Sequence, residues 1–125
     1  MTRILLDTQV ALWALGGHRR LPREARRLID RSEVFVSAAS IWEMAIKSSL
    51  GKLDADATAV NEALAPSGFE ELPVSGAHAA YVAHLPPHHR DPFDRLLVAQ
   101  SVLEALTLVT TDSQLAPYGG LVRVL

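Results

Sequence analysis

The stretch Arg3-Ile4-Leu5-Leu6-Asp7-Thr8 decides the fold class of this chain. Its three consecutive apolar residues predict a strand that is buried on both faces, as in the centre of a parallel sheet. A helical pattern then runs from Thr8 to Leu15 and ends at Gly16-Gly17. A buried strand followed at once by a helix is the repeating unit of α/β proteins, so the opening predicts an α/β fold.

The same alternation continues along the rest of the chain. Further strands are predicted at Val34–Val36, Phe69–Pro73, Thr107–Thr110 and Leu121–Leu125. The segments between them predict helices at 22–31, 38–51, 56–64, 75–85 and 92–104, and a helical turn at 112–115. No repeat or linker divides the chain. We therefore expect a single domain over residues 1–125, with helices on both faces of a central, mainly parallel sheet.

The composition excludes several classes of protein. Hydrophobic residues make up 49% of the 125 residues, charged residues 21%, and cysteine is absent. These values exclude a disordered chain, a disulfide scaffold and a thiolate site. Neither a membrane-spanning run nor a signal peptide is recognisable, so we expect a cytoplasmic protein with no membrane partner.

Charge is unevenly distributed along the chain. The net charge of −2 does not indicate nucleic-acid binding by overall electrostatics. Six arginines nevertheless fall between Arg19 and Arg31. They form either a solvated helix face, with Glu24 and Asp30 as partners, or a patch that binds a phosphate backbone.

Acidic residues follow two of the predicted strands. Asp7 ends the first strand directly, and Asp112 lies two residues beyond Thr110. The carboxyl ends of parallel strands meet at one edge of the sheet, where proteins of this class form their sites. We therefore expect the two carboxylates to share that edge, although each could instead serve only as a helix N-cap.

Two further acids lie on predicted helices rich in apolar residues. Glu43 could pair with Lys47 one turn on, and Asp94 could complete a capping box with Asp91 at the helix that starts at Pro92. A carboxylate among apolar neighbours is costly without a partner. A shared divalent cation would satisfy all four acids, and oxygen ligands without sulfur select Mg²⁺ or Mn²⁺.

Other residue types give weaker signals. His88-His89 could supply metal ligands or a general base, but the pair lies in a proline-rich loop and adjacent residues rarely face one site, so a catalytic role is the less favoured interpretation. Trp13 and Trp42 occupy apolar helical positions and are interpreted as core or interface residues. The chain has no glycine-rich phosphate loop and no serine in a nucleophile elbow, so no nucleotide cofactor is expected.

Four segments of the chain resemble the PIN domain family, and within it the VapC toxins of bacterial type II toxin–antitoxin pairs. The segments are Leu5–Thr8, Val36–Glu43, His89–Gln100 and Leu108–Asp112. They occur in the order and spacing of the family, and the block His89–Gln100 is the most specific. The resemblance implies a three-layer α/β/α domain with a central, mainly parallel sheet.

The resemblance also implies an activity and a set of site residues. The family's acidic quartet, which holds Mg²⁺ or Mn²⁺, falls on Asp7, Glu43, Asp94 and Asp112. Supporting positions fall on Thr8, Asp91 and Thr110. The implied reaction is hydrolysis of an RNA phosphodiester to 5′-phosphate and 3′-hydroxyl ends. A cognate antitoxin that covers the acidic site and a homodimer are implied as well.

Residues beside two of the acids depart from the family pattern. Gln9 stands where relatives often have histidine or serine, and Thr111 stands where arginine or lysine is common. Neither change removes an acid, so we expect both to affect the choice of substrate more than activity.

Two other classes of function stay open on sequence alone. One is another acid-site phosphotransfer enzyme. A haloacid-dehalogenase-type phosphatase would need an aspartate where Gln9 stands, and a receiver domain would need a lysine beyond Lys52. The other is a non-catalytic PIN-like interaction module, in which the acids are only helix caps. This module predicts no dependence on divalent cations.

Overall fold

The computed structural model describes residues 1–125, which form one five-stranded sheet. The strands are β1 (Thr2–Leu6), β2 (Ser32–Ser37), β3 (Phe69–Leu72), β4 (Thr107–Thr110) and β5 (Val122–Val124). Their order across the sheet is β3-β2-β1-β4-β5, and all neighbours are parallel. The predicted α/β class is confirmed, and the sheet expected to be mainly parallel is parallel throughout.

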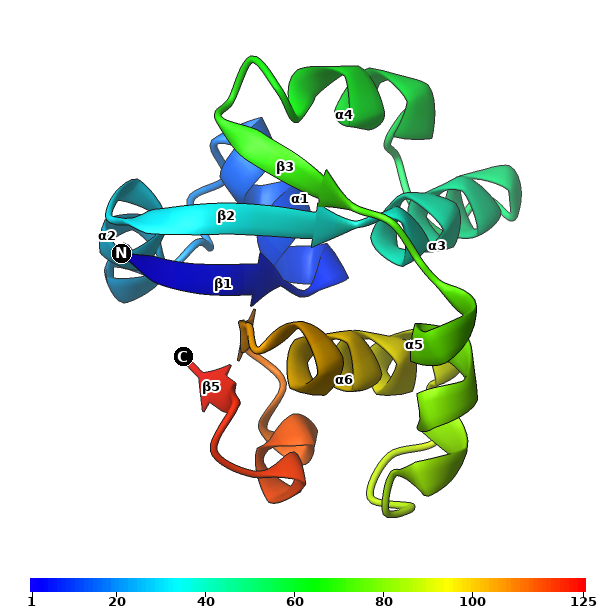
Figure 1. Cartoon of the computed structure of the whole chain (residues 1–125). Helices are drawn as coiled ribbons and strands as arrows, with labels where there is room; N and C mark the ends of the chain where they lie inside the picture. The colour runs from blue at the N-terminus through cyan, green and yellow to red at the C-terminus, as the bar shows by residue number, and fades with distance from the viewer.

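Helices cover both faces of this sheet (Figure 1). They are α1 (Thr8–Gly16), α2 (Arg23–Asp30), α3 (Ala38–Ser49), α4 (Ala57–Ala63), α5 (Gly76–Tyr81) and α6 (Pro92–Glu104), with short 3₁₀ segments η1 (Val82–His84) and η2 (Ser113–Tyr118). Residues of α1 to α4 pack on one face, and residues of α6 and η2 pack on the other. This arrangement is the expected three-layer architecture. None of the helices combines the length and hydropathy needed to span a membrane.

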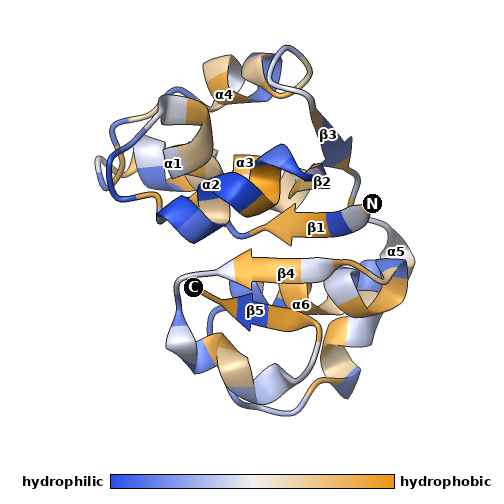
Figure 2. Cartoon of the chain, turned by 90° about the vertical axis from the view of Figure 1, so that its left-hand side faces the viewer, coloured by the Kyte–Doolittle hydropathy of each residue, from blue (hydrophilic) through white to orange (hydrophobic).

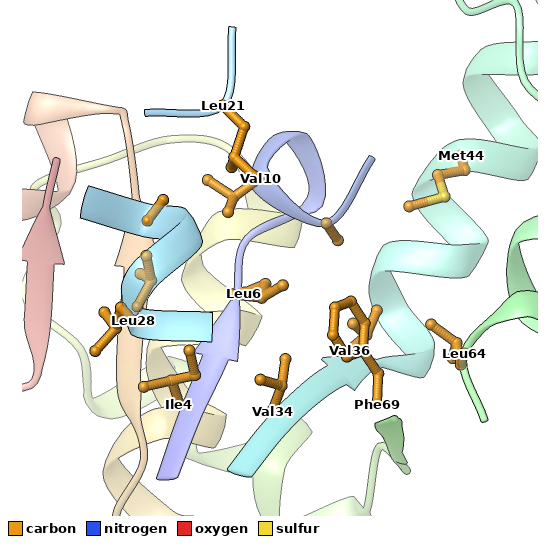
Figure 3. Close-up of a cluster of buried hydrophobic side chains, with 13 residues drawn as sticks. Ile4, Leu6, Val10, Leu21, Leu28, Val34, Val36, Met44, Leu64 and Phe69 are labelled. Atoms are coloured by element: carbon orange, nitrogen blue, oxygen red, sulfur yellow. The ribbon is translucent and has the colours of Figure 1, made fainter. Parts of the chain in front are cut away.

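Two hydrophobic clusters hold the sheet between its helix layers. The larger cluster has thirteen buried residues on the α1 face, including Ile4 and Leu6 of β1 (Figure 3). The smaller cluster has eight on the α6 face, including Leu5 and Leu108. Successive residues of a strand point to opposite faces, so Ile4, Leu5 and Leu6 are all fully buried. The apolar run that opens the chain therefore forms the centre of the molecule.

Strand register determines where the two strand-end acids lie. Leu6 pairs with Val109, and the N–H of Asp7 donates to the carbonyl of Val109 at 3.0 Å. Asp7 and Thr110 therefore lie next to each other at the carboxyl ends of β1 and β4. After β3 the chain returns across the sheet and adds β4 on the other side of β1, so the strand order reverses between β1 and β4. Open parallel sheets place their binding crevice at such a switch point.

Candidate active site

A pocket of about 450 Å³ opens at the carboxyl edge of the sheet, beyond the ends of β1 and β4. Its charged lining residues are Asp7, Glu43, Asp91, Asp94, Asp112, Lys47 and Lys52. All four carboxylates of the predicted quartet are thus brought together, along with the only two lysines of the chain. Five carboxylates against two ammonium groups give the lining a net charge of −3 when all are ionised.

Asp7 is held by hydrogen bonds from both of the elements beside it. Its Oδ1 accepts the N–H of Val10 at 2.8 Å as the N-cap of α1, and its Oδ2 accepts the hydroxyl of Thr110. The same hydroxyl oxygen accepts the N–H of Asp112 at 3.0 Å, so Thr110 joins the two strand-end acids. Burial raises the pKa of Asp7; these hydrogen bonds oppose the rise, and the charges of Glu43 and Asp112 add to it.

Replacing Thr110 with valine is expected to lower the free energy of unfolding by about 1–3 kcal/mol, because buried Asp7 loses a hydrogen-bond donor. Thr107→Val is the matched control, since Thr107 lies on the same strand and its side chain makes no hydrogen bond. Urea denaturation at neutral pH in EDTA measures the difference. Equal stability of the two variants would show that the Thr110 hydroxyl does not support Asp7.

Glu43 is buried on α3 between a threonine and a lysine. The hydroxyl of Thr8 donates to its Oε1 at 2.6 Å, and Nζ of Lys47 donates to its Oε2 at 2.6 Å. The hydrogen bond with Glu43 raises the pKa of Lys47, so Lys47 is an ammonium group that neutralises this carboxylate. The helical Glu43–Lys47 pair considered from the sequence is therefore present, and it lies inside the acidic pocket.

Asp94 lies in the first turn of α6, where burial and neighbouring carboxylates disfavour its charge. The capping box considered for Asp94 is not formed. Asp91 does cap α6, but its own N–H donates to Nδ1 of His89 at 3.0 Å. Burial and then the charge of Asp91 raise the pKa of Asp94 to about 7; His89 opposes this rise, and Asp7 and Glu43 add to it. A carboxylate in these surroundings favours any cation that can reach it.

His89 joins two of the acids, a role that the sequence pattern did not indicate. Its Nε2 lies 3.4 Å from Oδ2 of Asp94 and 3.3 Å from Oδ2 of Asp112. Because Nδ1 accepts the N–H of Asp91, the ring hydrogen is on Nε2 and is donated toward these carboxylates. The Tyr118 hydroxyl binds the backbone N–H of His89 at 3.0 Å and so holds the loop in place. In this tautomer His89 positions the acids and offers no lone pair to a metal from Nε2.

The donor set of the pocket fits a hard divalent cation. Carboxylate oxygens of Asp94 and Asp112 lie within 4.8 Å of each other beside His89, and Asp7 and Glu43 line the same pocket. Carboxylate oxygens without sulfur are the ligands that Mg²⁺ and Mn²⁺ prefer. Burial raises the pKa of both Asp7 and Asp94, so a bound cation would offset the cost of ionising these carboxylates. The residues present therefore suit such an ion, and their role as its ligands stays a prediction.

The fold and the site together define an α/β protein with a carboxylate pocket at the switch point of a parallel sheet. The sequence matches the PIN domain family over residues 4–121, and the chain belongs to this family. The family resemblance seen in the sequence is thereby confirmed. No curated protein matches the chain significantly by sequence.

Solved structures with a similar fold include chains from three bacterial complexes. VapBC2 from Rickettsia felis, bound to a DNA fragment from its promoter, has a TM-score of 0.69 at 15% identity, covering 98% of this chain and 96% of that one. A toxin–antitoxin complex from Klebsiella pneumoniae has a TM-score of 0.69 at 18% identity, with coverages of 97% and 96%. FitAcB from Neisseria gonorrhoeae has a TM-score of 0.61 at 21% identity, with coverages of 89% and 88%. These similarities show a shared fold and agree with the VapC resemblance of the sequence.

Proposed function

We propose that this protein is a divalent-metal-dependent endoribonuclease and the toxin of a toxin–antitoxin pair. The observation that carries the proposal is the convergence of four carboxylates on one pocket, where the pKa of Asp94 is raised to about 7. Membership of the PIN family supports it, as does the similarity of fold to chains of toxin–antitoxin complexes.

The residues that would hold Mg²⁺ or Mn²⁺ are Asp7, Glu43, Asp94 and Asp112. When bound, such an ion lowers the pKa of water and stabilises negative charge on a phosphoryl oxygen. Thr110 fixes the two strand-end acids relative to each other, and Thr8 orients Glu43. His89 sets the spacing of Asp94 and Asp112, while Asp91 holds the first turn of α6 in place. The substrate thus meets carboxylates whose positions are already defined.

The proposal extends to three partners. RNA is the substrate, and its products carry 5′-phosphate and 3′-hydroxyl ends. A cognate antitoxin inhibits the enzyme by covering the pocket, where an arginine among the carboxylates would supply the missing positive charge. A second copy of the chain completes a homodimer.

Incubation of purified protein with total cellular RNA tests the reaction. We expect cleavage in Mn²⁺ and none in EDTA, with 5′-phosphate and 3′-hydroxyl ends on the fragments. Copurified antitoxin is removed first by denaturation and refolding of the toxin. Cleavage of equal extent in EDTA would contradict the metal-dependent mechanism. Intact RNA in Mn²⁺, from protein that also fails to bind this ion, would favour the non-catalytic module.

Replacing Lys47 with methionine is expected to lower the stability of the protein in EDTA by about 1–3 kcal/mol, because buried Glu43 loses its counter-charge. This value is below that of a fully buried pair, since the Lys47 side chain is 47% exposed. Saturating Mn²⁺ should restore much of the loss. Lys52→Met is the control, because Lys52 lines the same pocket without an ion pair. Thermal melts of both variants with and without Mn²⁺ give the comparison. An equal loss with and without Mn²⁺ would mean that the ion does not reach Glu43.

A further inference from the structure

Lys52 is the one cationic side chain in the lining of the acidic pocket that pairs with no carboxylate. The chain has only two lysines among its twelve basic residues, and both of them line this pocket. Nζ of Lys47 is bound to Glu43 at 2.6 Å. Nζ of Lys52 forms no hydrogen bond and no ion pair, and the residue is exposed. The pocket therefore contains one ammonium group that is free to bind a ligand.

The end of α3 fixes the backbone position of Lys52. The N–H of Lys52 donates to the carbonyl of Lys47 at 2.8 Å, and the N–H of Gly51 donates to the carbonyl of Ser48 at 3.1 Å. These two bonds make a Schellman motif, in which Gly51 has the left-handed conformation with a φ of 72°. Both bonds use backbone atoms, so they do not depend on the side chain at position 52. The Lys52 side chain therefore begins at a defined point beside the last turn of α3.

Lys52 lies on the open side of the pocket. The helix α3 begins at the carboxyl end of β2 and runs outward from the sheet, so its last turn is far from the strands (Figure 1). Asp7 and Glu43 are buried, whereas Lys52 is exposed. A ligand that enters the pocket from solvent therefore passes Lys52 on its way to the buried carboxylates.

The charge of the pocket shows why an anionic ligand needs such a group. The lining carries a charge of −3, and one bound divalent cation would reduce this to −1. A phosphodiester brings one more negative charge, so the ion alone does not balance the site. Charges in a partly buried pocket are weakly screened, so this excess disfavours the second anion. Without Lys52 the excess would be larger by one charge, and no free cationic side chain would be left in the lining.

We propose that Lys52 binds an oxygen of the RNA phosphate that enters the acidic pocket. The proposal rests on the function proposed above, because the phosphate belongs to the RNA substrate. A lysine ammonium is a compact point charge on a flexible stem, and it is a common ligand of phosphate groups. Lys52 thus holds the phosphate at the pocket and takes part in no bond that forms or breaks. The division of labour is between Lys47, which neutralises Glu43, and Lys52, which binds the substrate.

Calorimetric titration of the full chain with uridine 5′-monophosphate, in saturating Mn²⁺, tests this role. The nucleotide carries the 5′-phosphate expected on the product and has no internucleotide bond to cleave, and uridine is the ligand without the phosphate. The variants are Lys52→Met, which removes the charge, and Lys52→Arg, which keeps it. Arg23→Met is the control, because it removes one positive charge outside the pocket. Arg23 is exposed on α2, which is strongly hydrophilic (Figure 2), and its side chain forms no hydrogen bond or ion pair.

Lys52→Met is expected to weaken binding of the nucleotide by about tenfold, the size of one hydrogen bond to a charged group. Lys52→Arg should recover most of this loss, and Arg23→Met should bind as the unchanged protein does. Mn²⁺ itself, titrated separately, should bind Lys52→Met at least as tightly, since a nearby positive charge is gone. A variant whose pocket was damaged would instead lose Mn²⁺.

Three results would overturn the proposal. They are unchanged nucleotide affinity in Lys52→Met, an equal loss in Arg23→Met, and equal affinity of the unchanged protein for uridine and for its monophosphate. Because the titration needs no cleavage, these results leave the test of ribonuclease activity untouched. Failure of the proposed function has a different signature, which is intact RNA in the cleavage assay.

Discussion

Replacing Asp94 with asparagine is expected to abolish RNA cleavage and, at the same time, to stabilise the metal-free protein. Loss of one carboxylate ligand removes several kcal/mol of transition-state stabilisation, which corresponds to a rate loss on the order of 10³-fold. The gain in stability has a separate cause. Burial and neighbouring carboxylates raise the pKa of Asp94 from 3.8 to about 7, so its ionised form is destabilising in the folded state. Asparagine has the same shape without the charge.

The size of this gain follows from the same pKa. At about 1.36 kcal/mol per pKa unit, and with a discount for the partial solvent exposure of Asp94, removal of this buried charge is expected to raise the free energy of unfolding by roughly 2 kcal/mol above pH 7. Urea denaturation in EDTA near pH 8 measures it, together with cleavage in Mn²⁺. Asp30→Asn is the control, because Asp30 is exposed on α2 outside the pocket, and neither property should change. Retained cleavage, or a lower stability of Asp94→Asn in EDTA, would contradict the assignment of Asp94.

The stability of the metal-free protein is expected to fall as the pH rises from about 4 to about 7. In this range the unfolded chain has released the proton of Asp94, whereas the folded protein still holds it. The raised pKa of Asp7 acts in the same direction. Stability is thus highest below the unfolded pKa of these groups and is lost as the pH passes their folded pKa.

Mn²⁺ should reverse this loss, because the ion competes with protons for the same carboxylates. At about 100 times its dissociation constant, a bound ion adds about 2.7 kcal/mol to the free energy of unfolding. Thermal melts should therefore show a large rise in Tm with Mn²⁺ near pH 8 and a much smaller one near pH 5. A rise of the same size at both pH values would show that Mn²⁺ binds away from the raised carboxylates.

The strand-end part of the site is predictable because it depends on local sequence and on parallel topology. An apolar strand followed by Asp7, and a second one followed by Asp112, must place both acids at one edge once the strands are parallel. The structure shows both acids in one pocket, joined through Thr110. Asp7 also caps α1, and Asp112 also caps η2. The two interpretations considered for these acids, helix cap and pocket residue, therefore hold at the same time.

The orientation of α3 illustrates what a periodic pattern misses. Its buried residues include Ser40 and Glu43, whereas Trp42 is 60% exposed and its ring makes a T-shaped contact with that of Phe93. The helix extends beyond the carboxyl end of the sheet, so one side faces the pocket and another faces solvent (Figure 1). The interpretation of Trp42 as a core residue was therefore wrong, which leaves an interface role for its exposed ring. Polar residues inside and an aromatic residue outside are expected where function overrides packing.

His89 could not be placed from the sequence for a different reason. Its position depends on the path of the proline-rich loop and on a hydrogen bond that its backbone N–H donates to the hydroxyl of Tyr118, which is 29 residues away. The adjacent His88 packs against the ring of Tyr118 instead, so the two histidines do point to different surroundings, as expected. The signal that could have found His89 is its place two residues before the helix cap Asp91, where a ring nitrogen can accept the cap's N–H.

A crystal soaked in Mn²⁺ gives the most direct test of cation binding by the four carboxylates. The anomalous difference map locates the ion without any assumption about activity. We expect a peak in the acidic pocket, with oxygens of Asp7 and Asp94 in its coordination sphere, and no such peak in crystals of Asp94→Asn. A saturating soak that leaves the pocket empty, or places the ion elsewhere on the surface, would contradict the metal site and the nuclease mechanism built on it.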